Sequence, residues 1–366
     1  MQKILFCFGT RPEAIKMAPL ILKCSEYGFA PIVCLTGQHK EMLQPFVDFF
    51  KLPVHHNLKI MKSNQSLSQL TAAILLGMDE VFEKFSPDIL LVQGDTTSTF
   101  TCALSAFYKK LPIGHVEAGL RTYNKYSPFP EEANRQMTTN IADIHFAPTQ
   151  LSKENLHRAG VQDNVLMTGN TSIDALRITL EKLNDNEFNY PNIDFNKRIL
   201  LVTSHRRENL GAPQENIFNA LLELLEKFED IEIVFPVHLN PMVQEKANHF
   251  LRDNKRIHLL KPLDYKEFIW MMKKSYLILS DSGGVQEEAP YLNIPVLVLR
   301  ENTERPEGVT SGTSTLVGTD KTTIVKHAEK LLSDKNHYAT VQKKDNPFGD
   351  GHASDKILKK LQTYLH

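Results

Sequence analysis

The chain has 366 residues, of which 42% are hydrophobic and 23% charged, and its formal net charge is −1. This length exceeds one typical hydrophobic core and predicts two domains of ordinary size. The balanced charge argues against a general nucleic-acid binder, because no basic field is available to neutralise phosphates. No apolar run approaches the ~18 residues that span a bilayer, and the N-terminal run is too short for a signal peptide. We therefore expect a cytoplasmic protein with no nucleic-acid or membrane partner.

The cysteine pattern favours the same compartment. Four cysteines occur, none of them in a CxxC pair, and each falls in a predicted strand or helix. We expect them to be small core residues and not disulfide partners. The four are Cys7, Cys24, Cys34 and Cys102.

The first half of the chain alternates short apolar runs with helical patterns. Residues 3–8 form one such run, and the helix predicted after it begins near Pro12, a residue suited to an opening turn. The dinucleotide fingerprint GxGxxG is missing there. In its place stand Arg11 and Lys16, two cations suited to a diphosphate or a carboxylate, with a surface charge pair as the alternative. Further strands are expected at 31–36, 88–92, 113–116, 143–147 and 165–168.

A long helix is predicted between residues 66 and 85. Ser66 and Gln69 form a capping box at its start. Apolar residues then recur at helical spacing and predict a stripe that faces the core. The stripe consists of Leu67, Leu70, Ile74, Met78, Val81 and Phe85.

The alternation stops at 184–197, which reads as a connection, and then restarts. Strands are expected at 199–203, 231–237, 276–279 and 295–299, and helices at about 214–228 and 354–365. Because strands and helices alternate, the sheets should be mostly parallel. The sequence therefore predicts two α/β domains of similar design.

The turn Ser282-Gly283-Gly284 follows one of these strands and opens a helical pattern. Its glycines let the backbone approach an anion closely, and a helix N-terminus adds partial positive charge. Glu287 or Glu288, about one turn further on, could accept hydrogen bonds from a ribose. An ordinary strand-to-helix turn is the alternative interpretation.

Polar residues collect where the predicted strands end, which is the ligand-binding edge of an open α/β sheet. The first domain offers Asp95, Glu117 and Glu131 there, and the second offers His205 followed by two arginines. Crowded carboxylates raise one another's pKa, which suits proton transfer near neutral pH. A histidine near a phosphate can carry the proton of a leaving group. Two facing domains would bring these loops to one cleft.

Each of these residues also has a simpler interpretation. Asp95, before two threonines, could be a helix N-cap, and Glu131 could complement the dipole of the helix it opens. His205 could be a surface histidine, and His238 could cap a turn. The functional interpretation depends on the set recurring at strand ends.

No metal-binding pattern is present. The sequence contains no HExxH, no Cys/His quartet and no DxD-like pair at a strand end. We expect no metal cofactor, because cationic side chains and an amide-lined turn can take the place of Mg²⁺.

Eight motifs occur in a fixed order along nearly the whole chain. Together with the closing NPFGDG segment, they resemble the bacterial non-hydrolysing UDP-N-acetylglucosamine 2-epimerases. The motifs are FGTRPEAIK (8–16), QGDTT (93–97), HVEAGLR (115–121), PEEANR (130–135), SHRREN (204–209), PVHLNP (236–241), DSGGVQEEAP (281–290) and TERPE (303–307).

The resemblance implies a glycosyltransferase-B-type α/β fold, with two Rossmann-like domains whose mostly parallel sheets face a central cleft. The expected N-terminal domain spans 1–170 and carries the catalytic carboxylates. The expected UDP-binding domain spans 171–353, and the helix 354–366 packs back on the N-terminal domain.

The resemblance also implies the reaction. The family interconverts UDP-GlcNAc and UDP-ManNAc by eliminating UDP to 2-acetamidoglucal and adding it back, without metal or NAD, and supplies bacterial surface polysaccharide. A homodimer is expected. The alternatives are a hydrolysing 2-epimerase that releases ManNAc and UDP, a sugar transferase of the same fold, or a silent binder.

Residue roles follow by position in the motifs. Asp95, Glu117 and Glu131 would be the acid/base and charge-stabilising carboxylates, and His205 would assist at the leaving UDP. Which carboxylate acts as base in each direction stays open. The expected UDP-sugar contacts are Arg11, Lys16, Phe268, Ser282, Gly283, Gly284, Glu288 and Arg305.

Two regions depart from the family pattern. Leu263 stands where some relatives carry a glutamine near the uracil. Some relatives bind a second UDP-GlcNAc as an activator, and Gln38, Arg206 and His238 match that region. Glu41 replaces a glutamine found in regulated relatives, which is a departure from the pattern that implies allosteric activation.

Overall fold

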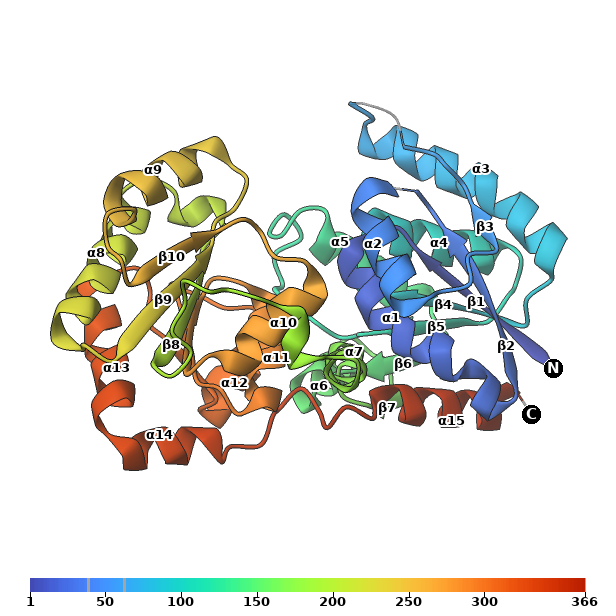
Figure 1. Cartoon of the computed structure of the whole chain (residues 1–366). Coiled ribbons are helices and arrows are strands. Elements are labelled where there is room, and N and C mark those ends of the chain that lie inside the picture. Colours follow the sequence, from blue (N-terminus) through green and yellow to red (C-terminus); the bar gives the residue numbers. More distant parts are fainter. Residues whose placement is uncertain (38–39, 62–63, 366) are drawn as a thin grey trace. The chain divides into compact units, whose positions relative to one another are not determined.

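The computed structural model describes residues 1–37, 40–61 and 64–365, and it divides into two compact units (Figure 1). Unit 1 comprises Met1–Ala175 and Phe348–His366, and unit 2 comprises Leu176–Pro347. The change from unit 1 to unit 2 falls inside helix α7 (Thr171–Glu181), whereas the sequence placed a boundary just before this helix. In the described part of the chain, no helix has the length and apolar character needed to cross a bilayer.

Unit 1 contains a seven-stranded sheet in the order β3-β2-β1-β4-β5-β6-β7. Each of its strand pairings in the described residues is parallel. The predicted strands are all present, and the very short β3 is an addition. The strands are β1 (Gln2–Phe8), β2 (Phe29–Leu35), β3 (His56–Asn57), β4 (Ile89–Gln93), β5 (Ile113–Val116), β6 (Ile144–Ala147) and β7 (Val165–Met167).

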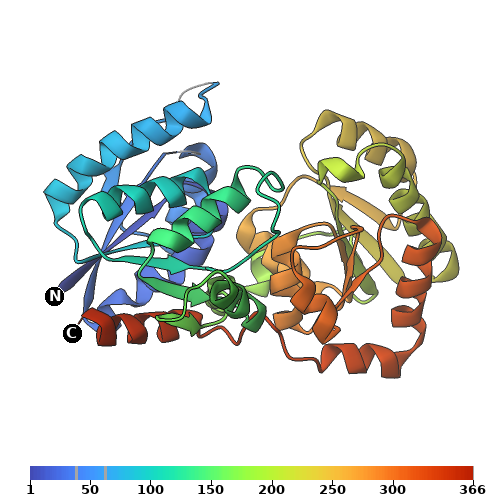
Figure 2. The same ribbon diagram turned by 180° about the vertical axis from the view of Figure 1, so that it is seen from behind.

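Helices cover both faces of this sheet, which is why its strands are continuous apolar runs. Figures 1 and 2 show α3 and α4 on one side of the sheet, and α1 with the C-terminal α15 on the other. The helices are α1 (Arg11–Lys23), α2 (Lys40–Phe50), α3 (Leu67–Phe85), α4 (Thr97–Tyr108), α5 (Glu131–Ile141), α6 (Gln150–Arg158), the first residues of α7, and α15 (Ala353–Leu365).

The predicted start and core stripe of α3 are largely confirmed. The Ser66 side chain accepts the Gln69 amide at 3.2 Å, and the Gln69 side chain accepts the Ser66 amide at 2.9 Å. The stripe begins at Leu70, because Leu67 at the first helical position is 43% exposed. All four cysteines are buried, as expected, and burial raises the pKa of the Cys24 thiol to about 12.

Unit 2 repeats the design with a six-stranded parallel sheet in the order β10-β9-β8-β11-β12-β13. Its strands are β8 (Arg198–Thr203), β9 (Ile231–Pro236), β10 (Ile257–Leu260), β11 (Leu277–Ser280), β12 (Val296–Val298) and β13 (Ser314–Leu316). Its helices, besides the rest of α7, are α8 (Ala212–Lys227), α9 (Pro241–Leu251), α10 (Tyr265–Lys274), α11 (Gly283–Glu288), α12 (Pro306–Ser311), α13 (Lys321–Ser333) and α14 (Lys335–Gln342).

The two sheets have the same topology. Numbered within its own unit, each sheet contains the strand order 3-2-1-4-5-6, which is the doubly wound Rossmann arrangement. The order reverses between β1 and β4 in unit 1, and between β8 and β11 in unit 2. Loops that leave the carboxyl ends of these strand pairs form the crevice where such sheets bind ligands. The α/β class and the parallel sheets expected from the sequence are therefore confirmed.

The C-terminal helix α15 is fastened to unit 1 by Asp174. This buried carboxylate accepts the backbone amides of Ala353 at 3.0 Å and Ser354 at 2.8 Å, and it also accepts the Ser354 hydroxyl. Burial raises the pKa of Asp174, while these hydrogen bonds act in the opposite direction. A carboxylate at a helix N-terminus also complements the helix dipole.

We predict that Asp174→Ala lowers the free energy of unfolding by about 2–4 kcal/mol, because it leaves buried amides at the start of α15 without a hydrogen-bond acceptor. Urea unfolding and hydrogen exchange of the α15 amides measure this effect. Asp355→Ala is the matched control on the same helix. Asp355 pairs with Lys23 at 2.6 Å but is 27% exposed, so its loss should cost under ~1 kcal/mol. Equal effects of the two substitutions would contradict the assignment.

Candidate active site

The loop after β1 and the loop after β4 are joined by one buried carboxylate. Glu13 is 2% exposed and accepts the amides of Gly9 at 2.9 Å and Thr10 at 2.7 Å. It also accepts the hydroxyls of Thr96 at 2.6 Å and Thr99 at 3.0 Å. Glu13 therefore ties together the two loops at the switch point of unit 1.

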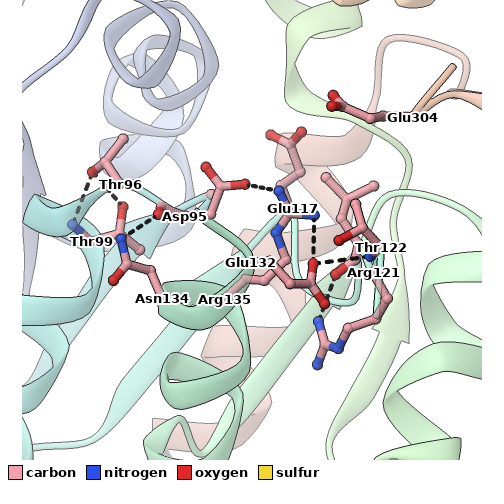
Figure 3. Close-up of polar contacts among 12 residues, drawn as sticks. Asp95, Thr96, Thr99, Glu117, Arg121, Thr122, Glu132, Asn134, Arg135 and Glu304 are labelled. Atoms are coloured by element: carbon pink, nitrogen blue, oxygen red, sulfur yellow. Dashed lines mark hydrogen bonds and ion pairs between the residues drawn. The ribbon is translucent and has the colours of Figure 1, made fainter. Parts of the chain in front are cut away.

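Asp95 lies in the loop after β4 and is held by α5 (Figure 3). Its Oδ2 atom lies 2.5 Å from Nη2 of Arg135, and its carbonyl oxygen accepts the Asn134 side chain at 3.0 Å. The N-cap of α4 is Thr96, whose hydroxyl accepts the Thr99 amide at 3.1 Å. The N-cap interpretation of Asp95 is therefore wrong, because the next residue performs that role.

Glu132 supports Arg135 from the other side (Figure 3). It is fully buried, and one of its oxygens lies 3.2 Å from Nη1 of Arg135. It also accepts the amides of Thr122 at 3.0 Å and Tyr123 at 3.1 Å, which belong to the loop before α5. Asp95, the buried guanidinium and this loop are thereby held as one network.

Glu117 follows β5, the strand next to β4, with a backbone φ of +62°. This left-handed conformation is costly for a residue with a Cβ and tends to occur at functional sites. Nζ of Lys16 lies 2.6 and 2.8 Å from the two carboxylate oxygens, and the Gln93 side chain donates a further hydrogen bond. Lys16, expected beside a diphosphate, thus pairs with a candidate catalytic carboxylate.

Gly119 allows the same segment to pass close to α6. A Cβ at this position would lie 2.2 Å from the Ser152 carbonyl oxygen, and its φ is +96°. Only glycine suits both conditions. The EAGLR motif therefore combines a strained glutamate with a glycine required by packing.

Glu131 is the first residue of α5 and is half-buried. It precedes Arg135 by four residues, so both side chains start from the same face of the helix. This places it next to the network around Asp95. Its position in the first turn is also the one expected for a carboxylate that complements the helix dipole.

His115 lies in the interior of β5, two residues before Glu117. Its Nε2 lies 2.7 Å from the Gly94 carbonyl oxygen, so Nε2 carries the proton and donates. Burial lowers the pKa of His115 to about 3, and burial lowers the pKa of its cross-strand neighbour His145 to about 4. Both rings are therefore neutral near pH 7.

In unit 2, the loop after β8 is fastened to the end of β11 by Asp281. This fully buried carboxylate accepts the amides of His205 and Arg206, and the side chain of Asn209, each at 2.9 Å. Its second oxygen, Oδ1, lies 3.0 Å from Nδ1 of His205, whose side chain is 42% exposed. His205 is thus exposed, as the simpler interpretation required, but its ring has a buried carboxylate partner.

The Ser282-Gly283-Gly284 turn follows β11 as predicted, and Ser282 is the N-cap of the short helix α11. A Cβ at Gly283 would meet nothing within 4 Å, so the space above this backbone is open. Arg305, expected near the diphosphate, forms an ion pair with the buried Glu287. Glu288, the expected ribose ligand, is also buried.

The remaining predicted residues are dispersed. Phe268 on α10 is partly buried against the core of unit 2. His238 follows β9, and its Nδ1 accepts the Asn240 amide at 3.1 Å, so the turn-capping interpretation holds for it. Its ring stacks on that of His205, with centroids 6.2 Å apart. Gln38 lies outside the described residues.

Several supporting residues lie within the motifs, but the sequence alone assigned no role to them. Each carries a charged or amide side chain that holds a loop or another side chain of the site. The supporting residues are Glu13, Gln93, Glu132, Arg135 and Asp281.

Across the described residues, no group of three or more His, Cys, Asp and Glu side chains could hold a metal ion.

Two Rossmann-like units with polar loops at both switch points define a protein of the glycosyltransferase-B-type fold class. The family model described as UDP-N-acetylglucosamine 2-epimerase matches residues 23–362. The UDP-N-acetylglucosamine 2-epimerase of Bacillus subtilis is 49% identical over 363 residues, covering 98% of this chain and 94% of that protein. The chain therefore belongs to the UDP-N-acetylglucosamine 2-epimerase family.

Solved structures agree with this assignment. The UDP-GlcNAc 2-epimerase of Neisseria meningitidis, bound to UDP-GlcNAc, has a TM-score of 0.90 and is 46% identical, covering 99% of this chain and all of its own. A structure of an S. aureus protein with UDP has a TM-score of 0.89 at 44% identity, covering 100% of this chain and 97% of its own.

We predict that His115 makes the protein sensitive to acid. Below the unfolded pKa of ~6.5, the unfolded chain binds a proton that the native ring, with a pKa of about 3, does not. The free energy of unfolding should therefore fall as the pH falls, by about 1.4 kcal/mol per pH unit. His115→Gln keeps a donor for the Gly94 carbonyl oxygen. Between pH 6 and 5, this variant should reduce the slope of the free energy of unfolding against pH by about this amount. Denaturant unfolding across this range tests it, and an unchanged slope would refute it.

Proposed function

We propose that this chain is a non-hydrolysing enzyme that reversibly epimerises UDP-GlcNAc and UDP-ManNAc at C2. The observation that carries the proposal is a pair of carboxylates at the carboxyl ends of two neighbouring strands of unit 1, Asp95 after β4 and Glu117 after β5. Asp95 is held by Arg135, and Glu117 is held by Lys16 in a strained backbone conformation. Fixed charges beside a nucleotide-sugar suit a reaction in which charge develops on the sugar ring.

The chemistry requires such groups because the C2 hydrogen of the substrate is not next to a carbonyl. Its removal becomes feasible only as the C1–O bond breaks and positive charge builds on the ring. A carboxylate takes the C2 proton, the C–H electrons form the C1–C2 double bond of 2-acetamidoglucal, and the C1–O electrons leave with UDP. Return of a proton to the opposite face of C2 and addition of UDP to C1 give the epimer.

We assign the acid/base and charge-stabilising roles to Asp95, Glu117 and Glu131, without dividing them between the two directions. His205 assists the departing diphosphate. Supporting the UDP-binding assignments, related proteins were solved with UDP-GlcNAc and with UDP. The proposed UDP-sugar contacts are Arg11, Lys16, Phe268, Ser282, Gly283, Gly284, Glu288 and Arg305.

Further parts of the proposal concern assembly and supply. We propose that the enzyme acts as a homodimer in the cytoplasm and supplies ManNAc units for a bacterial surface polysaccharide. A second UDP-GlcNAc as activator would bind near Arg206 and His238, which lie at the ends of β8 and β9. Activation would appear as a rate that rises when UDP-GlcNAc is added to UDP-ManNAc.

Proton NMR of the purified protein with UDP-GlcNAc in D₂O tests the reaction. We expect UDP-ManNAc to appear, with deuterium at C2 of both isomers, because the carboxylate exchanges its proton with solvent. Accumulation of free ManNAc and UDP without UDP-ManNAc would identify a hydrolysing enzyme. No change in either signal would leave a transferase or a binding protein.

We predict that Asp95→Asn and Glu131→Gln each fold normally and lower kcat by about 100-fold or more, because each removes a positioned proton carrier or charge. Steady-state assays with circular dichroism as the folding check measure this. Glu154→Gln is the control, since Glu154 is a 45% exposed carboxylate paired with Arg158 on α6. Turnover near the parent value in either active-site variant would remove that residue from the mechanism.

A further inference from the structure

We propose that Asp281 is a positioning residue for His205: it accepts the Nδ1 proton of the imidazole, so that Nε2 is the ring nitrogen that exchanges a proton with the substrate. Oδ1 of Asp281 lies 3.0 Å from Nδ1. This inference rests on the proposed role of His205 at the departing diphosphate. It adds a second residue and a defined tautomer to that role.

The surroundings of Asp281 leave Oδ1 available for the ring. Three donors occupy the other oxygen, Oδ2: the amides of His205 and Arg206 and the side chain of Asn209. Oδ1 is buried and accepts no hydrogen bond in the described part of the chain, although Nδ1 of His205 lies 3.0 Å from it. A buried carboxylate oxygen without a donor is costly, so the ring nitrogen is its natural partner.

The ionic form of Asp281 is consistent with this role. Burial opposes its ionisation, but the His205 ring and the two backbone amides outweigh burial, and the pKa of Asp281 lies below its ordinary value. An ionised carboxylate only accepts hydrogen bonds, so the facing ring nitrogen must carry a proton. Other charged or titratable groups in this loop and the adjacent strand ends are Arg206, Glu208, His238 and Arg300.

The two ring nitrogens of His205 also lie in different environments. Nδ1 faces a carboxylate that is fully buried, whereas the His205 side chain as a whole is 42% exposed. If the Nδ1 proton is fixed by Asp281, Nε2 is the ring nitrogen that can gain or lose a proton. When the C1–O bond breaks, the electron pair goes to the diphosphate oxygen, and a proton on Nε2 passes to it. The reverse transfer accompanies re-addition, and the ring alternates between imidazolium and its Nδ1–H neutral form.

Nitrogen NMR of protein labelled in its histidine rings tests the tautomer without any substrate. The His205 signals are identified by their loss in His205→Gln. At a pH where the ring is neutral, we expect the Nδ1–H tautomer in the parent protein. In Asp281→Asn the amide NH₂ would face Nδ1, so we expect the Nε2–H tautomer. A parent ring that is mainly Nε2–H would overturn the proposal.

Asn209→Ala is the matched control for this experiment. It removes one donor from Oδ2 of Asp281 and loosens the same loop, but it leaves Oδ1 facing the ring. We expect its His205 tautomer to stay Nδ1–H. A switch in this variant would show that loop rearrangement, not the carboxylate, determines the tautomer, and would overturn the proposal.

A double-mutant cycle tests the functional part. Asp281→Asn should lower kcat by about 100-fold or more while KM changes little, as His205→Gln should, and the double variant should be no slower than the slower single one. If Asp281→Asn lowers kcat by the same factor in the His205→Gln variant as in the parent enzyme, Asp281 acts independently of the ring and the proposal fails. An inactive parent enzyme would instead refute the proposed function, and the tautomer would still be measurable.

Discussion

Buried carboxylates hold the strand-end loops of this chain, and the rest of the site depends on them. Glu13, Glu132 and Asp281 are each 2% exposed or less, and each accepts two backbone amides together with side-chain donors. Removing a carboxylate from water is costly unless several donors replace the water. The same donors therefore have little freedom to move, and the loops that supply them are held in one conformation.

This constraint explains how exposed functional groups can be held precisely on loops. Arg135 is fixed by Glu132 and in turn contacts Asp95, so a half-buried carboxylate takes its position from a fully buried one. Asp281 has the same relation to His205 in unit 2. In both units the supporting charge comes from a neighbouring element, so the loop alone does not position its functional residue. Such support is what preorganised electrostatic catalysis requires.

Charge pairing also shapes the candidate active site. Lys16 neutralises Glu117, and Arg305 is paired with the buried Glu287. Lys16 and Arg305, two of the proposed UDP-sugar contacts, are therefore each paired with a carboxylate of their own unit. The strained φ of Glu117 is maintained by this pairing, by Gln93 and by the close packing of Gly119. The predicted meeting of both sets of loops at one cleft stays a prediction.

The sequence by itself determined the fold class, most elements and the family. Alternating apolar runs predicted both parallel sheets, because helices cover both faces of each sheet. It also identified candidate site residues in the motifs, among them Asp95, Glu117 and His205. The elements α12, β13 and α14 were not predicted, because they have only six, three and eight residues, too few for a clear periodic pattern. The 13-residue helix α13 was also not predicted, although it carries buried apolar residues at helical spacing. Only the tertiary structure decided which charges pair: Lys16 lies 101 residues from Glu117, and His205 lies 76 from Asp281. Pairing depends on which strand ends become neighbours in the sheet, and the spacing of residues along the chain does not contain that information.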